Sequence, residues 1–203
     1  MSLQAPLQSP LQAVAVLREE HRWIARMLDC LQHLVEDAGR RERLDAEAAA
    51  ELLALFEHFA DGIHQQREES ALFPRLFARA ASVAERVALG RLCGEHEEER
   101  RALRLLNEHL LGAIYGRGSD LASFLRTATV FLRLHREHLC IENTDLLPLA
   151  ERLLQPEDDA PLLRFYTQLE LGGPSAASID ARIRDLSARL GLQPASAPGA
   201  SEH

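Results

Sequence analysis

The chain has 203 residues, of which 46% are hydrophobic and 27% are charged, a mixture typical of a globular protein with a sizeable core. Acidic residues outnumber basic ones by 31 to 23, and the net charge of −8 argues against nucleic acid and anionic membranes as partners, because both require a basic face. Aromatic residues make up only 5%, which favours helices over sheets, and no apolar run approaches the roughly 20 residues that span a bilayer.

Cysteine usage and the N-terminal residues bear on the compartment. The three cysteines are widely spaced and form no C-x-x-C motif, so a disulfide framework is not expected. The first ten residues, MSLQAPLQSP, lack the basic and apolar stretches of a signal peptide. We therefore expect a cytoplasmic protein.

Hydrophobic residues recur every three to four positions in four long stretches, the spacing of helices that bury one face. These stretches span residues 11–37, 45–74, 82–114 and 121–154. Asp45 is a candidate N-cap of the second stretch, and Ser82 with Glu85 forms an S-x-x-E capping box at the start of the third. Gly39 and the charged stretch to Arg43 are expected to close the first helix, and the run GRGSD at 116–120 is expected to form a turn.

Two shorter helical patterns follow, one after Pro156 and one over residues 177–190. No stretch alternates with period two for long enough to predict a strand. We predict an all-α fold, an up-down-up-down four-helix bundle with one or two additional C-terminal helices. The expected parts are a flexible lead-in at 1–10, the bundle at 11–155, C-terminal helices packed on the bundle at 156–192, and a disordered tail at 193–203.

An internal repeat stands out. The motif H-x-x-x-E-x-x-x-L-[FL]-P occurs twice, beginning at His64 and, 74 residues later, at His138. A Glu-His pair precedes each copy, and the two pairs lie 75 residues apart, at Glu20-His21 and Glu95-His96. Agreement this close is hard to obtain by chance and indicates two equivalent halves, each a helix with one histidine followed by a helix with the motif.

The spacing within the motif predicts metal binding. Residues i and i+4 lie about 40° apart around a helix and about 6 Å apart along it, on one face. An imidazole and a carboxylate placed so can bind one metal ion, or two neighbouring ions with the carboxylate between them. The candidate ligands are His21, His64, Glu68, His96, His138 and Glu142. Such mixed nitrogen and oxygen ligation suits Fe, Mn or Zn in a dinuclear site and is too nitrogen-rich for Mg or Ca.

The doubled motif and the order of its helices resemble the hemerythrin-like (HHE cation-binding) domain family over roughly residues 11–154. In that family a four-helix bundle holds a non-haem di-iron centre. The resemblance implies two Fe ions bridged by Glu68 and Glu142 with the four histidines as terminal ligands, and Zn or Mn as substitutes. Ferritin-like proteins use E-x-x-H instead, and none of the nine histidines here has a glutamate three residues before it.

One position departs from the oxygen-carrying hemerythrins, which place a second histidine four residues after the first on the third helix. Here that position is Arg100. The departure argues against reversible oxygen carriage of the worm type. It leaves one coordination position to water, hydroxide, a ligand gas or a nearby carboxylate such as Glu95 or Glu99.

The other candidate residues have simpler interpretations. His33, His58 and His109 lie about 120° to 140° from the ligand face and are expected to be surface or packing residues. His135 lies about 20° from Glu142, which leaves it open as a ligand or as a hydrogen-bond partner of one. Glu69 and the run Glu97-Glu98-Glu99 are expected to lie on solvated faces. Trp23 and the three cysteines, Cys30, Cys93 and Cys140, are expected to be packing residues.

These features predict a di-iron protein that binds, senses or buffers dioxygen, nitric oxide or iron, with a small diatomic ligand or iron as its partner. We do not favour an enzyme. The alternatives are a redox enzyme of the peroxidase, oxidase or nitric-oxide reductase type, an iron donor in stress repair, and a bundle whose metal only stabilises the fold. The apolar face of the helix at 177–190 leaves room for a homodimer.

Overall fold

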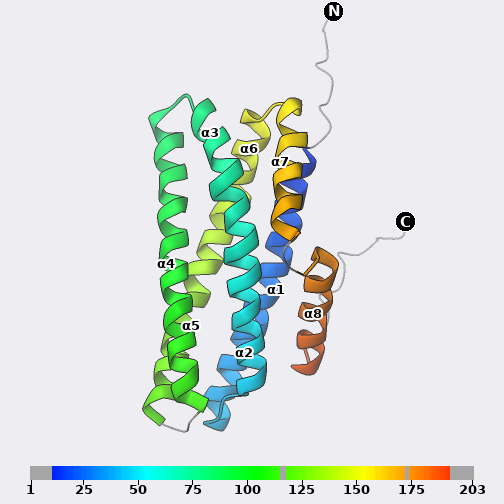
Figure 1. The fold of residues 1–203 in the computed structure, drawn as a ribbon. Coiled ribbons are helices and arrows are strands. Elements are labelled where there is room, and N and C mark those ends of the chain that lie inside the picture. Colours follow the sequence, from blue (N-terminus) through cyan, green and yellow to red (C-terminus); the bar gives the residue numbers. More distant parts are fainter. Residues whose placement is uncertain (1–10, 115–117, 172–173, 193–203) are drawn as a thin grey trace, which may run out of the picture.

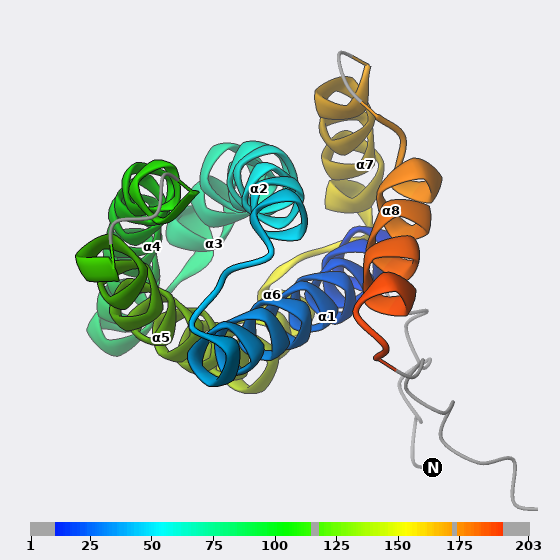
Figure 2. The same ribbon diagram turned by 90° about the horizontal axis from the view of Figure 1, so that it is seen from below.

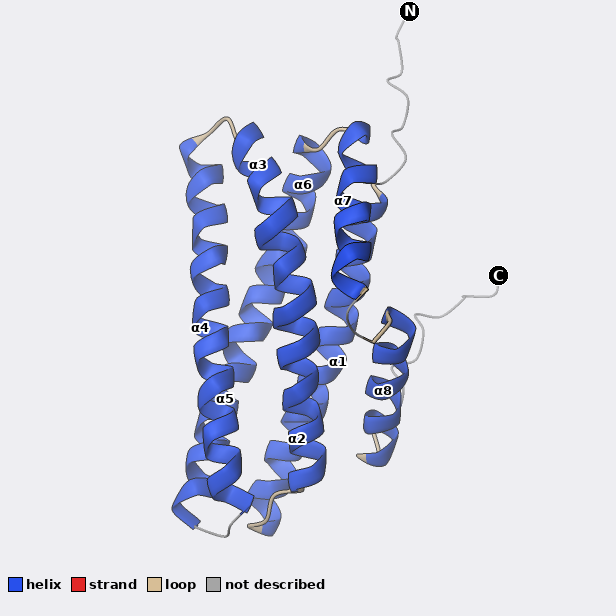
Figure 3. Cartoon of the chain, viewed as in Figure 1, coloured by secondary structure: helices blue, strands red, loops and turns tan. Residues whose placement is uncertain are grey.

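The computed structural model describes residues 11–114, 118–171 and 174–192. Every regular element in these ranges is helical and none is a strand (Figure 3), which confirms the all-α prediction. The expected lead-in at 1–10 and tail at 193–203 lie outside the described residues. None of the described helices combines the length and apolar character needed to cross a membrane.

Long helical rods lie side by side in the described part of the chain, and the helices nearest the C-terminus lie against them (Figure 1). The elements in chain order are α1 (Gln12–Arg41), α2 (Ala46–Leu55), π-helical η1 (Phe56–Gln65) and η2 (Glu68–Leu72), α3 (Phe73–Arg79), α4 (Val83–Ile114), α5 (Gly118–Ile141), π-helical η3 (Glu142–Leu146), α6 (Leu147–Leu153), α7 (Pro156–Glu170) and α8 (Ala176–Arg189). The first rod is α1, the second runs from α2 to α3, the third is α4, and the fourth runs from α5 to α6. Helix α1 packs against α2 and α5, and α4 packs against the same two helices. The view from below shows these helices arranged around a shared interior (Figure 2).

Helix starts follow the capping residues. The Asp45 side chain accepts a hydrogen bond from the Ala48 backbone N–H at 3.1 Å. At the start of α4 the Ser82 hydroxyl accepts from the Glu85 N–H, and the Glu85 carboxylate accepts from the Ser82 N–H, both at 3.1 Å. Both predicted caps are therefore confirmed.

One predicted boundary is met and another is wrong. The first helix passes through Gly39 and ends at Arg41, within the stretch expected to close it, followed by Glu42 in the left-handed region at φ 52°. Glycine inside a helix costs only about 1 kcal/mol relative to alanine, and the basic last turn of α1 interacts favourably with the helix dipole. The fourth helix begins at Gly118, inside the run 116–120 that was expected to form a turn.

The prolines of the two motifs mark a change of helix type. Pro74 and Pro148 lie in the first turns of α3 and α6, directly after η2 and η3. A proline at the start of a helical segment removes a backbone N–H that has little role there. The rods therefore continue past both prolines. Because π-helical turns occur mostly as single-turn insertions at functional sites, their position within the motifs is informative.

The core consists of two apolar clusters. One contains Ile24 and Ile63 and extends along α1, α2, η1, α4, α5 and α8. The other contains Leu17 and Leu72 and extends along α1, η2, α3, α4, η3, α6 and α7. Along the rods, buried polar residues lie between these clusters. The candidate ligands occupy this polar layer.

The two C-terminal helices pack on the outside of α1 (Figure 2). The Asp159 carboxylate near the start of α7 accepts a hydrogen bond from the Ala13 N–H at 2.8 Å. The apolar face of α8 is buried, with Ile179, Ile183 and Leu186 each at most 1% exposed. This face is used inside the chain, so it no longer supports the homodimer that the sequence suggested.

Candidate metal centre

The structure brings all six candidate ligands into one buried layer. Each rod contributes at least one of them. Their elements are α1 for His21, η1 for His64, η2 for Glu68, α4 for His96, α5 for His138 and η3 for Glu142. None of the six is more than 4% exposed.

The six residues form two groups of four that share both carboxylates. His21 and His64 belong to one group, His96 and His138 belong to the other, and Glu68 and Glu142 belong to both. Within each group the potential ligand atoms all lie within 4.8 Å of one another. Two adjacent groups that share both carboxylates are compatible with the arrangement that the resemblance implies.

The contacts inside the layer are made by the imidazole Nε2 atoms. His138 Nε2 lies 2.9 Å from Glu142 Oε1, and His21 Nε2 lies 3.3 Å from Glu142 Oε2. His96 Nε2 lies 3.4 Å from Glu68 Oε2 and 3.0 Å from His138 Nε2. Two ring nitrogens that face each other so closely need a cation or a proton between them.

The layer also leaves buried polar atoms without partners. Both carboxylate oxygens of Glu68, both of Glu142, and Nε2 of His21 are buried and have no hydrogen-bond partner. Buried polar groups are costly unless they are paired or coordinate a metal. These residues therefore fit a metal-binding site.

The outer ring nitrogen of each histidine meets a side-chain oxygen. The four pairs are His21 Nδ1 with Asn143 Oδ1 at 3.0 Å, His64 Nδ1 with Glu20 Oε2 at 3.0 Å, His96 Nδ1 with Glu69 Oε1 at 2.7 Å, and His138 Nδ1 with Glu95 Oε2 at 2.8 Å. When Nδ1–H donates to these oxygens, the lone pair of Nε2 faces the layer. Partners of this kind fix the tautomer and orientation of metal-binding histidines.

These partners explain the rest of the repeat. In each half, the glutamate of the Glu-His pair supports the motif histidine, as Glu20 supports His64. The residue directly after each motif glutamate supports the lone histidine of the opposite half, Glu69 in one case and Asn143 in the other. The expectation that Glu69 lies on a solvated face is therefore wrong. Sequence reasoning missed these roles, although the doubled Glu-His pair was their signal.

Charges in the layer shift the pKa values of the histidines. Burial disfavours the charged imidazolium of His96, but the nearby carboxylates of Glu142, Glu68 and Glu69 outweigh burial and raise the pKa to about 12. Burial likewise opposes protonation of His138, yet Glu142 and Glu95 raise its pKa to about 10. Burial raises the pKa of Glu142, but His138 and its other imidazole neighbours hold it well below the usual range. The layer thus attracts positive charge.

His135 and Glu99 form a separate buried pair beside the layer. His135 belongs to neither metal group, and its Nε2 lies 3.4 Å from Glu99 Oε2. Glu99 is 2% exposed and accepts a hydrogen bond from Gln65 Nε2 at 2.7 Å, so its expected place on a solvated face is wrong. Burial raises the pKa of Glu99 to about 7. Neither Glu99 nor Glu95 is a member of the metal groups.

The residues expected to lie off the ligand face do so. His33, His58 and His109 are partly buried and belong to neither group. The Trp23 ring packs 5.5 Å from the ring of Phe59. The three cysteines form no disulfide; Cys30 is buried and Cys93 is partly buried, but Cys140 is exposed, so its expected place among the packing residues is wrong.

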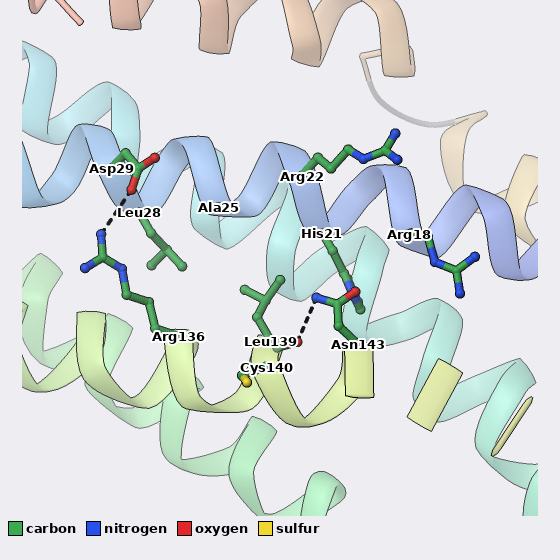
Figure 4. A pocket seen from close by; sticks show the side chains of 10 residues that line it. All are labelled: Arg18, His21, Arg22, Ala25, Leu28, Asp29, Arg136, Leu139, Cys140 and Asn143. Atoms are coloured by element: carbon green, nitrogen blue, oxygen red, sulfur yellow. Dashed lines mark hydrogen bonds and ion pairs between the residues drawn. The ribbon is translucent and has the colours of Figure 1, made fainter. Parts of the chain in front are cut away.

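A surface cavity of about 460 Å³ reaches the outer side of the layer between α1 and α5 (Figure 4). Leu28 and Leu139 form part of its wall, and His21 and Asn143 lie at one end. The cavity therefore adjoins the supporting side of His21, where Nδ1 meets Asn143 Oδ1.

The helical scaffold and the two His/Glu groups define a helical protein with a site compatible with metal binding. The profile of the Hemerythrin HHE cation binding domain matches residues 12–150, and the chain belongs to this family. No curated protein and no solved structure matches the chain. The resemblance seen in the motifs is thereby confirmed, and α7 and α8 lie beyond the matched residues.

Proposed function

We propose that the chain is a non-haem di-iron protein, built on an up-down-up-down four-helix bundle, that binds, senses or buffers dioxygen, nitric oxide or iron. The observation that carries this proposal is the pair of four-residue groups that share Glu68 and Glu142. Shared carboxylates hold two metal ions at a short distance, which a mononuclear structural site does not require.

In this proposal His21 and His64 would hold one iron ion and His96 and His138 the other, and Glu68 and Glu142 would be available to both. Mixed imidazole and carboxylate ligation suits iron, with zinc or manganese as substitutes. When bound, iron supplies redox chemistry and a position for a small diatomic ligand. The chain's own residues orient the imidazoles through Nδ1 and exclude water, since both glutamates are 0% exposed.

Arg100 supports a role other than reversible oxygen carriage. Its Nη1 atom lies 3.2 Å from Asp61, 3.0 Å from Gln65 and 3.0 Å from Glu69. The guanidinium therefore stabilises the partner of His96 and supplies no metal ligand, because an arginine side chain offers donors only.

We keep a small diatomic molecule or iron as the proposed partner, with no nucleic acid and no membrane. The net charge of −8 supports this choice. Three cysteines that form no disulfide support the cytoplasm as the compartment.

Metal analysis tests the proposal directly. After anaerobic reconstitution with iron, we expect about two iron ions per chain, one for each four-residue group. Optical spectra recorded while dioxygen, peroxide and nitric oxide are added in turn identify the ligand that changes the centre. An iron content at or below about 0.2 per chain would exclude a di-iron protein.

A redox enzyme is the second candidate, and Glu99 favours it. A buried carboxyl group beside the layer with a pKa of about 7 is suited to moving protons near neutral pH. If the chain consumes peroxide, Glu99→Gln should lower the rate about 100-fold, as expected for loss of a general acid or base, with unchanged iron content. The neighbouring Glu98→Gln is the control, since Glu98 is exposed. Equal rates in all three proteins would remove the support that Glu99 gives to an enzyme.

A further inference from the structure

Arg67 is a fully buried charged residue within the first motif. It lies between His64 and Glu68 in the sequence and is 2% exposed. Its Nη1 atom forms an ion pair with Glu20 Oε1, while Glu20 Oε2 lies 3.0 Å from His64 Nδ1. One carboxylate therefore joins the buried guanidinium to a candidate metal ligand.

The other side of Arg67 is held by α7. Its Nη2 atom donates to the backbone carbonyl of Tyr166 at 3.1 Å and pairs with the carboxylate of Glu170. The guanidinium also lies over the Tyr166 ring, 5.0 Å from its centroid. A buried charge is costly unless it is paired and hydrogen-bonded, so the partners on α7 stabilise Arg67 where it is.

The second half of the repeat lacks this connection. Ile141 occupies the position equivalent to Arg67. Glu95, the counterpart of Glu20, pairs instead with Arg91 at 3.3 Å, and the Arg91 side chain is 55% exposed. In the described part of the chain, Arg67 ties the first half to α7, which lies beyond residues 12–150, whereas an isoleucine side chain at the equivalent position can form no ion pair.

We propose that Arg67 is a positioning residue that couples α7 to the metal group of His21 and His64. The proposal rests on the proposed metal centre. Binding at this group needs His64 with a proton on Nδ1 and with Nε2 directed into the layer, and Glu20 favours that state. Arg67 fixes Glu20, and α7 fixes Arg67. Because coupling between two sites is reciprocal, a bound metal stabilises the docked α7, and a docked α7 strengthens metal binding.

Hydrogen exchange on the full chain tests the coupling without any substitution. Metal-free protein is compared with protein loaded with Zn²⁺, which is redox-inert. We expect exchange in residues 162–170 to slow by about fivefold or more on loading, the lower end of typical coupling between sites. The first turn of α7, anchored by Asp159 to Ala13, and α8 are internal references that should change less.

The metal content of the same samples distinguishes a failure of the coupling from a failure of the proposed metal centre. Unchanged exchange in residues 162–170 with two Zn²⁺ ions bound overturns the coupling and leaves the metal centre intact. A chain that takes up no Zn²⁺ or iron overturns the proposed function, and the coupling with it.

A conservative substitution on α7 tests the reverse effect, that of the docked helix on metal affinity. Glu170→Gln removes a charge from α7 that is 32% exposed, so the fold should persist. We expect the affinity of one of the two Co²⁺ equivalents, followed by optical absorption in competition with a chelator, to fall about tenfold. Glu157→Gln, at an exposed position in the first turn of α7, should leave both affinities unchanged. No loss in Glu170→Gln, or an equal loss at both metal positions, contradicts the proposal.

Discussion

Replacing Glu68 or Glu142 by alanine is expected to remove both metal ions, so that iron content after reconstitution falls from about two per chain to nearly none. Each carboxylate belongs to both four-residue groups, so each substitution leaves both groups with three members. Replacing a single histidine differs in its effect, because His21→Ala leaves the group of His96 and His138 complete. We therefore expect that variant to retain about one iron ion per chain.

Two histidines serve as controls for this experiment. His33 and His58 are partly buried and belong to neither group, so alanine at either position should leave the iron content near that of the unchanged chain. Circular dichroism shows whether each variant stays helical, which separates loss of a ligand from loss of the fold. Equal iron losses in the glutamate variants and these controls would mean that the six residues do not bind the metal.

Much of the fold follows from local rules. Apolar spacing of three and four predicts the long rods, and the capping residues Asp45, Ser82 and Glu85 predict two of the helix starts. The π-helical segments η1, η2 and η3 could not be predicted in this way. Their wide turns depend on packing around the polar layer, whereas sequence periodicity assumes about 100° per residue throughout.

The six candidate ligands were accessible to sequence reasoning because the motif occurs twice with matched spacing. Their supporting residues were not, because a carboxylate beside other carboxylates has the pattern of a solvated face. Glu69 and Glu99 are held inside by an imidazole, an amide or a guanidinium from another rod. The contact of Arg67 with α7 joins residues about 100 positions apart, and no local pattern predicts it.

The stability of the protein should depend on metal and pH together, because protons and metal ions compete for the same imidazoles. In the metal-free chain the neighbouring carboxylates raise the pKa of His96 to about 12 and that of His138 to about 10, which favours protonation of this imidazole pair at neutral pH. A histidine whose pKa is higher in the folded than in the unfolded state contributes stability that is fully present below the unfolded value, near 6.5. That contribution declines as pH rises and is lost above the folded value.

The stability that metal binding adds has the opposite pH dependence, because it increases as pH rises. The imidazoles must be neutral to bind, so loading releases protons, and the apparent affinity should rise at least about tenfold for each pH unit, the slope for one proton. A metal ion that binds only the folded state at 100 times its dissociation constant adds about 2.7 kcal/mol, which corresponds to a rise of roughly 5–10 °C in Tm for a chain of this size. At a fixed concentration of metal, the difference in Tm between loaded and metal-free protein should therefore grow from pH 6 to pH 9.

Thermal unfolding of the two forms, recorded side by side at pH 6, 7, 8 and 9, measures this difference. Below pH 6 protons should displace the metal, and the two curves should converge. A difference that narrows as pH rises would mean that protons do not compete with metal at His96 and His138. Curves that coincide at every pH would mean that the buried layer between the two apolar clusters is satisfied by its own ion pairs. The oxygens of Glu68 and Glu142 argue against that outcome, because they lie near imidazole nitrogens but have no hydrogen-bond partner, and a bound cation would satisfy them.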